Sequence, residues 1–162
     1  MTDILFDPGE RLSPAMACSL DDRLCPDTYA VVHLKRREEG IRGTLSIFEA
    51  EAVKVLARVS AAVLGKREYR RRPDRHRFIP NLVTLEYGVD DNPHLNFLFR
   101  RGPEIPLDRL SAALRRKWER SLWSSASGEQ WFYCEDREPG SRVVGYCSKE
   151  GAGSLLVKTL TF

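Results

Sequence analysis

The stretch NLVTLEYGVDDNPHLNFLFRR, residues 81–101, carries the clearest pattern in the chain and decides the expected fold. Its two ends, residues 81–88 and 94–101, are rich in β-forming side chains that alternate in the manner of strands. The residues VDDNP between them supply the Asp, Asn and Pro that tight turns require. The stretch therefore predicts a β-hairpin.

The flanking sequence predicts how this hairpin is completed into one domain, which suits a chain of 162 residues. Apolar spacing predicts further strands at 28–36, 129–136 and 154–162, and helices at 47–64, 106–123 and 141–150. We expect Gly65 to end the first helix, the basic residues 66–78 to form a loop, and residues 1–27 to form an arm with little regular structure. The order β-α-β-β-α-β-α-β predicts an α+β fold over residues 28–162: a ferredoxin-like or RRM-like antiparallel sheet of five strands, with helices mainly on one face.

Strand phase divides the hairpin side chains into two sets, because successive residues point to opposite faces of a sheet. The large apolar set, which includes Phe97, is expected to face the helices. Glu86, His94 and Asn96 then share the other face near the turn. A carboxylate oxygen, an imidazole nitrogen and an amide oxygen together suit Mn²⁺ or Mg²⁺ better than Zn²⁺. The alternative is that all three are polar residues on a solvated sheet face.

A second candidate pair lies in the short helix expected at 141–150. Tyr146 and Lys149 are three residues apart, so they share a helix face. A tyrosine can act as a covalent nucleophile, and a nearby lysine can stabilise negative charge or help to move a proton. The alternative is a half-buried helix tyrosine beside a surface lysine.

Composition restricts the class of protein. No apolar run approaches the roughly 20 residues of a membrane-spanning helix, and the first residues, MTDILFDPGERL, lack the pattern of a secretory signal. We therefore expect a cytoplasmic protein without a membrane partner. Its four cysteines, Cys18, Cys25, Cys134 and Cys147, form no CxxC pair and are expected to be free thiols in a reducing compartment.

The net charge of +3 is mild, but basic residues cluster in two segments, 66–77 and 109–120. Such clusters attract polyanions by neutralising phosphates and releasing counterions. A solvated charged loop or helix face would have the same composition.

Taken in order, these segments resemble the HUH endonuclease superfamily, and in particular the rolling-circle replication initiators known as Rep proteins. The stretch LEYGVDDNPHLNFLF resembles the second motif of that family with its preceding acidic ligand, and VVGYCSKEG resembles its third motif, Tyr-x-x-Lys. The strand TYAVVHLKR stands where the family has its first motif, without the usual threonine-rich form. Asn96 departs from the family's second histidine, although some relatives have glutamine there.

The resemblance implies a sequence-specific enzyme that nicks and rejoins single-stranded DNA at a replication origin or element end. A divalent ion held by Glu86, His94 and Asn96 would polarise the scissile phosphate, and Tyr146 would attack it to form a 5′-phosphotyrosine link, with Lys149 nearby. Candidate DNA-binding residues are Arg70, Arg71, Arg72, Arg75, Arg100 and Arg101. We expect no helicase to be fused to this domain, so a host helicase is the expected partner for unwinding. For a viral element the location would be the host nucleus.

Three alternatives remain open at this point. A related small HUH transposase would use the same chemistry. A non-catalytic nucleic-acid-binding module could use the same open sheet face without metal, as RNA-recognition sheets do, although no aromatic-rich strand of that family is evident. A toxin, antitoxin or other protein-interaction domain would make the motifs coincidental.

Overall fold

The computed structural model describes residues 13–34, 45–73, 78–87, 93–125, 131–138, 141–147 and 155–162. These residues form an α+β fold around one four-stranded antiparallel sheet with the order β2-β3-β1-β4. Its strands are β1 (Thr28–His33), β2 (Asn81–Glu86), β3 (His94–Phe99) and β4 (Phe132–Asp136). Each coincides with a predicted strand, and β2 pairs with β3 as the predicted hairpin. The turn at 88–92 lies outside the described residues.

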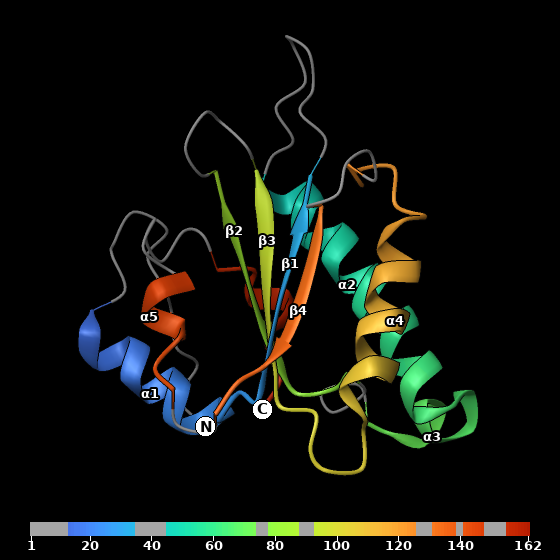
Figure 1. Cartoon of the computed structure of the whole chain (residues 1–162), viewed down its shortest axis with the longest axis horizontal. Helices are drawn as coiled ribbons and strands as arrows, with labels where there is room; N and C mark the ends of the chain where they lie inside the picture. Colours follow the sequence, from blue (N-terminus) through green and yellow to red (C-terminus); the bar gives the residue numbers. More distant parts are fainter. Residues whose placement is uncertain are drawn as a thin grey trace, which may run out of the picture.

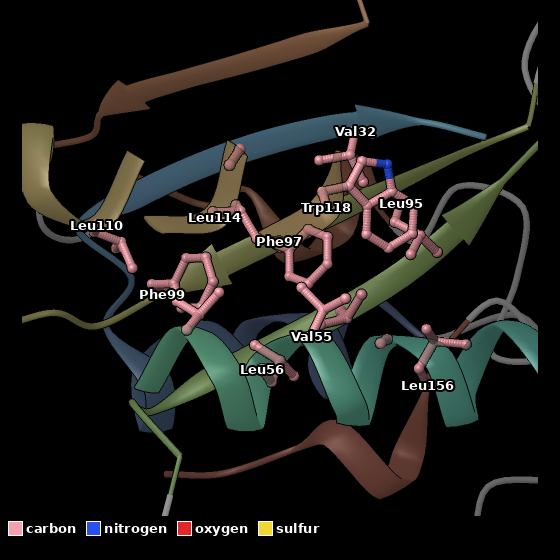
Figure 2. Packing of buried hydrophobic residues seen from close by; sticks show 14 of the residues in the cluster. Val32, Val55, Leu56, Leu95, Phe97, Phe99, Leu110, Leu114, Trp118 and Leu156 are labelled. Carbon is pink, nitrogen blue, oxygen red and sulfur yellow. The ribbon is translucent and has the colours of Figure 1, made fainter. Parts of the chain in front are cut away.

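One face of the sheet is covered by two long helices, α2 (Leu45–Leu64) and α4 (Leu107–Trp118) (Figure 1). Figure 2 shows Phe97 and Phe99 of β3 pointing into the space between these helices. Both rings are fully buried, and Phe97 meets Trp118 of α4 edge to face with 6.5 Å between the ring centroids. The predicted phase of β3 is therefore confirmed, since alternation places every second residue in this core.

The opposite face is also partly covered, which the sequence did not predict. Helices α1 (Pro14–Leu24) and α5 (Val144–Cys147) lie on that side of the sheet (Figure 1). Leu20 and Leu24 of α1 are buried with Leu82 of β2 and Leu98 of β3 in a second apolar cluster. The expectation of helices mainly on one face was therefore incomplete.

The expectation of an irregular arm is wrong for its second half, because residues 14–24 form α1. Ser13 caps this helix by accepting a hydrogen bond from the Met16 backbone N–H at 3.2 Å. Pro14 stands in the first turn, where a missing N–H costs nothing, so this proline is compatible with the start of a helix. Residues 1–12 lie outside the described residues.

The expected loop at 66–78 is also partly helical. Gly65 ends α2 as predicted, with a φ of +87° that glycine tolerates and residues with a Cβ rarely adopt. The short helix α3 (Lys66–Arg71) follows at once. Residues 74–77 lie outside the described residues.

The expected fifth strand at 154–162 does not form a continuous strand of the sheet over its described residues, 155–162. Two isolated bridges, Leu155 with Thr84 and Thr161 with Asn81, attach this segment to the outer edge of β2. Between them the 3-10 helix η3 (Val157–Thr159) turns the backbone away, and the Thr159 N–H and hydroxyl both donate to the Leu156 carbonyl. Within the described residues, no helix combines the length and apolarity needed to cross a membrane.

Candidate metal and tyrosine site

Glu86 and His94 lie side by side on the sheet face that carries α1 and α5. They are directly opposed in the β2–β3 register, and His94 Nε2 is 3.0 Å from Glu86 Oε2. The Glu86 side chain is 1% exposed and that of His94 is 17% exposed. A carboxylate removed from water to this extent is costly unless it is paired or binds a cation, and the imidazole supplies one such partner. The predicted proximity of these two residues is present in the structure.

A second histidine adjoins this pair. His33, the last residue of β1, is opposed to His94 in the β1–β3 register, and the two imidazole rings are stacked with centroids 5.6 Å apart. The Leu34 N–H bonds to the Pro93 carbonyl, so His33 and His94 form the narrow kind of antiparallel pair, in which opposed side chains are closest. Sequence analysis missed His33, although alternation along β1 could have placed it on this face.

Asn96 is one row further along β3 and is tied to the sheet on both sides. Its Oδ1 accepts a hydrogen bond from the Tyr29 hydroxyl at 2.8 Å, and its Nδ2 donates to Thr84 Oγ1 at 3.2 Å. The side chain is 1% exposed. An amide oxygen has two lone pairs, so Oδ1 keeps one further acceptor position. The structure thus places Asn96 on the predicted face, in a hydrogen-bonded setting that the sequence did not indicate.

Tyr29 is the central residue of this network and was also missed. Burial raises the pKa of its hydroxyl well above the ordinary value, and negative charge on Cys147, Glu86 and Tyr146 raises the pKa further. The hydroxyl therefore remains a hydrogen-bond donor to Asn96 at any physiological pH.

Tyr146 is presented by α5, a helix of only four residues that is held from outside. Val144 and Cys147 on its inner side are buried, whereas Tyr146 is 63% exposed. Asp21 of α1 accepts a hydrogen bond from the Val144 backbone N–H at 3.1 Å and so caps the start of α5. Lys149, the predicted companion of Tyr146, lies outside the described residues.

Among the described residues, the candidate DNA-binding arginines lie on or directly after α3 and directly after β3. Arg70 and Arg71 are exposed on α3, which lies beside α2 on the other side of the sheet (Figure 1). Arg72 Nε lies 3.4 Å from Glu68 Oε1, and Arg75 is outside the described residues. The remaining two, Arg100 and Arg101, line one shallow hollow together with Arg72.

Arg101 has a structural role in that hollow. Its guanidinium donates to Thr28 Oγ1 at 2.9 Å, to the Ile105 carbonyl at 2.6 Å and to the Asp136 carboxylate. It also lies 3.7 Å from Asp27 Oδ1. These contacts join β1, β4 and the segment after β3, so the side chain is engaged within the fold.

Potential metal ligands are few among the described residues. Within them, no group of three or more His, Cys, Asp and Glu side chains is gathered closely enough to hold an ion. The four cysteines are free thiols, and Cys147, the last residue of α5, is buried. The Glu86–His94 pair, with the neighbouring His33 ring and Asn96 amide, is accordingly the best donor set in this part of the chain. Comparison with protein-family models, curated proteins and solved structures found no match to this chain.

Proposed function

We propose that this chain is a divalent-metal-dependent endonuclease of the HUH type that nicks and rejoins single-stranded DNA at a replication origin or element end. The observation that carries the proposal is the Glu86–His94 contact of 3.0 Å, on the side of the sheet that also carries α5, the helix of Tyr146. The strand order β2-β3-β1-β4 supports the ferredoxin-like arrangement that such a site requires.

The donor chemistry fits a divalent cation. Glu86 contributes a buried carboxylate and His94 an imidazole within reach of the same point, since donor atoms on one ion stand about 3 Å apart when each bond is about 2.1 Å. The remaining lone pair of Asn96 Oδ1 is compatible with a further ligand on this face. When bound, the ion would supply Lewis-acid polarisation of the scissile phosphate.

Tyr146 would supply the nucleophile. Its oxygen attacks phosphorus as the phenolic proton leaves, the bond from phosphorus to the 3′ oxygen breaks, and that oxygen takes up a proton. The products are a free 3′-OH and a 5′-phosphotyrosine, so the reaction can be reversed to rejoin the strand. Exposure of Tyr146 supports this role, because a DNA phosphate must reach it from solvent. Lys149 would stabilise charge beside the tyrosine.

A non-catalytic module for single-stranded nucleic acid is the second candidate. It is favoured by aromatic and basic groups on the same sheet face: Tyr29 and Tyr133 meet edge to face at 6.3 Å, and Arg137 lies 5.2 Å from the Tyr29 ring centre. Tyr133 is 48% exposed on the edge strand β4. Exposed aromatic rings are stacking platforms for bases.

The two candidates are separated by incubating the chain with end-labelled single-stranded DNA of randomised sequence, with Mn²⁺ or with EDTA. The proposed enzyme yields an Mn²⁺-dependent, SDS-resistant protein–DNA adduct that Tyr146→Phe abolishes and that Glu86→Ala and His94→Ala suppress. Tyr133→Phe is the matched control, because it removes a phenolic hydroxyl from the same sheet face and should leave adduct formation intact. Salt-sensitive binding without any adduct would reject the enzyme in favour of the binding module.

A further inference from the structure

The sheet face that carries Glu86 and His94 presents a continuous row of three ionisable side chains. Glu86 is opposed to His94 across β2 and β3, and His94 is opposed to His33 across β3 and β1. Directly opposed residues of antiparallel strands point to the same face. Three neighbouring strands therefore contribute a carboxylate and two imidazoles at one end of the sheet.

Asn96 is less well placed than His33 to share a cation with Glu86 and His94. It belongs to the next row of the register, opposite Thr84 and Val31, and its Oδ1 already accepts the Tyr29 hydroxyl. Turning the amide toward His94 would break hydrogen bonds to both Tyr29 and Thr84 in a site that is 1% exposed, and a buried polar group left without its partners costs about 1–3 kcal/mol.

We propose that His33 is the third protein ligand of the metal site, so that Glu86, His94 and His33 hold the ion and Asn96 instead orients Tyr29. This inference rests on the metal site of the proposed function. The second imidazole of the site would thus belong to His33 on the neighbouring strand β1. The resemblance places the corresponding ligand on β3, two residues after His94, where this chain has Asn96.

As the structure places them, the Glu86, His94 and His33 side chains are not close enough together to hold an ion, so the stacked rings must move for this role. Their centroids are 5.6 Å apart with 28° between their planes, whereas two imidazole nitrogens on one ion stand roughly 3 Å apart. The backbones already hold the two residues as a narrow pair, so the inference requires rotation of the two side chains and no change in strand register. His33 is only partly buried.

The ligand set changes the expected choice of metal. Two imidazoles and one carboxylate suit Mn²⁺, Fe²⁺, Co²⁺ or Zn²⁺, whereas Mg²⁺ prefers an all-oxygen shell. The proposal therefore expects Co²⁺ and Mn²⁺ to bind the chain without DNA and Mg²⁺ to bind much more weakly.

The test measures Mn²⁺ affinity of the full chain by calorimetry and Co²⁺ binding by its visible absorption, both without DNA. His33→Ala should weaken Mn²⁺ binding by about tenfold or more and alter the Co²⁺ spectrum, since even outer partners of ligands change affinity 10–100-fold. Val31→Ala, on the same strand and face but in the next row, is the matched control and should bind as wild type does. Asn96→Ala should change Mn²⁺ affinity much less than His33→Ala.

A second measurement avoids dependence on a variant that might fold poorly. Zn²⁺ added to the wild-type chain should shift the imidazole ¹⁵N NMR signals of His33 and His94 together, because a ring nitrogen changes its chemical shift strongly when it binds a metal. Unchanged Mn²⁺ affinity in folded His33→Ala, or an unshifted His33 ¹⁵N signal beside a shifted His94 signal, overturns the inference. Because neither experiment contains DNA, an enzyme that still forms the Tyr146 adduct would leave the proposed function standing after the inference has failed.

Discussion

The Asp21 carboxylate on α1 accepts a hydrogen bond from the backbone N–H of Val144, the first residue of α5, at 3.1 Å. The two residues are 123 positions apart in the chain. Four residues cannot form a stable helix alone, so α5 depends on this cap and on packing against α1. Helix α1, in the segment where the sequence predicts little regular structure, therefore positions the helix that carries Tyr146.

Replacing Asp21 with alanine should destabilise the chain and loosen α5. Loss of a side-chain cap costs about 0.5–2 kcal/mol in the free energy of unfolding. Asp21→Asn keeps an acceptor oxygen and serves as the matched control. Urea unfolding gives the free energies, and hydrogen exchange at Val144 reports the loosening. Equal protection of that amide in the alanine variant and the wild type would refute the capping role.

Stability should also depend on pH through Asp21. Burial raises the pKa of this carboxyl above its ordinary value of 3.8, although hydrogen bonds from the Val144 and Val143 N–H groups oppose the effect. A raised folded-state pKa means that the contribution of Asp21 to stability is fully present below the ordinary value and is lost as pH rises through the raised one. Wild type should therefore gain stability relative to Asp21→Asn as pH falls from about 7 to about 4. Urea unfolding of both proteins across this range measures the difference, and a constant difference contradicts the prediction.

Removing the Tyr29 hydroxyl should destabilise the sheet face more than removing an exposed one. Tyr29→Phe deprives the buried Asn96 Oδ1 of its 2.8 Å donor, at a cost of about 1–3 kcal/mol. Tyr133→Phe, whose hydroxyl contacts the Glu135 carboxylate at the surface, should change stability by less than about 0.5 kcal/mol. Thermal unfolding of both variants makes the comparison, and similar losses in the two would argue against a structural role for the Tyr29–Asn96 bond.

Arg101 and its neighbour Arg100 should respond differently to truncation. Arg101→Ala removes hydrogen bonds to Thr28, Ile105 and Asp136 and should cost about 1–3 kcal/mol of stability. Arg100 is exposed, so Arg100→Ala should stay within about 0.5 kcal/mol of wild type. Urea unfolding measures both. A stable Arg101→Ala with weakened DNA binding would restore this arginine to the DNA-contacting set.

Tyr133 should contribute to binding of single-stranded DNA. It is 48% exposed on the same face as Tyr29, and a base stacked on an aromatic ring is worth about 1–3 kcal/mol. Tyr133→Ala should therefore weaken binding of an oligonucleotide by about 5- to 150-fold, whereas Tyr133→Phe keeps the ring and the affinity. Fluorescence anisotropy at fixed salt gives the affinities, and equal weakening in both variants would point to the hydroxyl instead of the ring.

The sequence by itself determined the four strands of the sheet, the two long helices and the phase of the hairpin. These depend on local alternation and helical periodicity, so Phe97 was correctly placed in the core and Glu86 beside His94 on the opposite face. The prediction of a fifth strand was wrong for a reason that is also local. A 3-10 turn at Val157–Thr159 interrupts a segment whose sequence pattern is otherwise strand-like.

Only the tertiary structure decided what surrounds the candidate site. Strand register is set by contacts between distant segments, so no pattern within β1 could reveal that His33 stacks on His94 or that Tyr29 reaches Asn96. The cap from Asp21 to α5 likewise joins residues that are far apart in the chain. Local periodicity specifies which side of an element a residue occupies, and long-range packing specifies which residue it meets there.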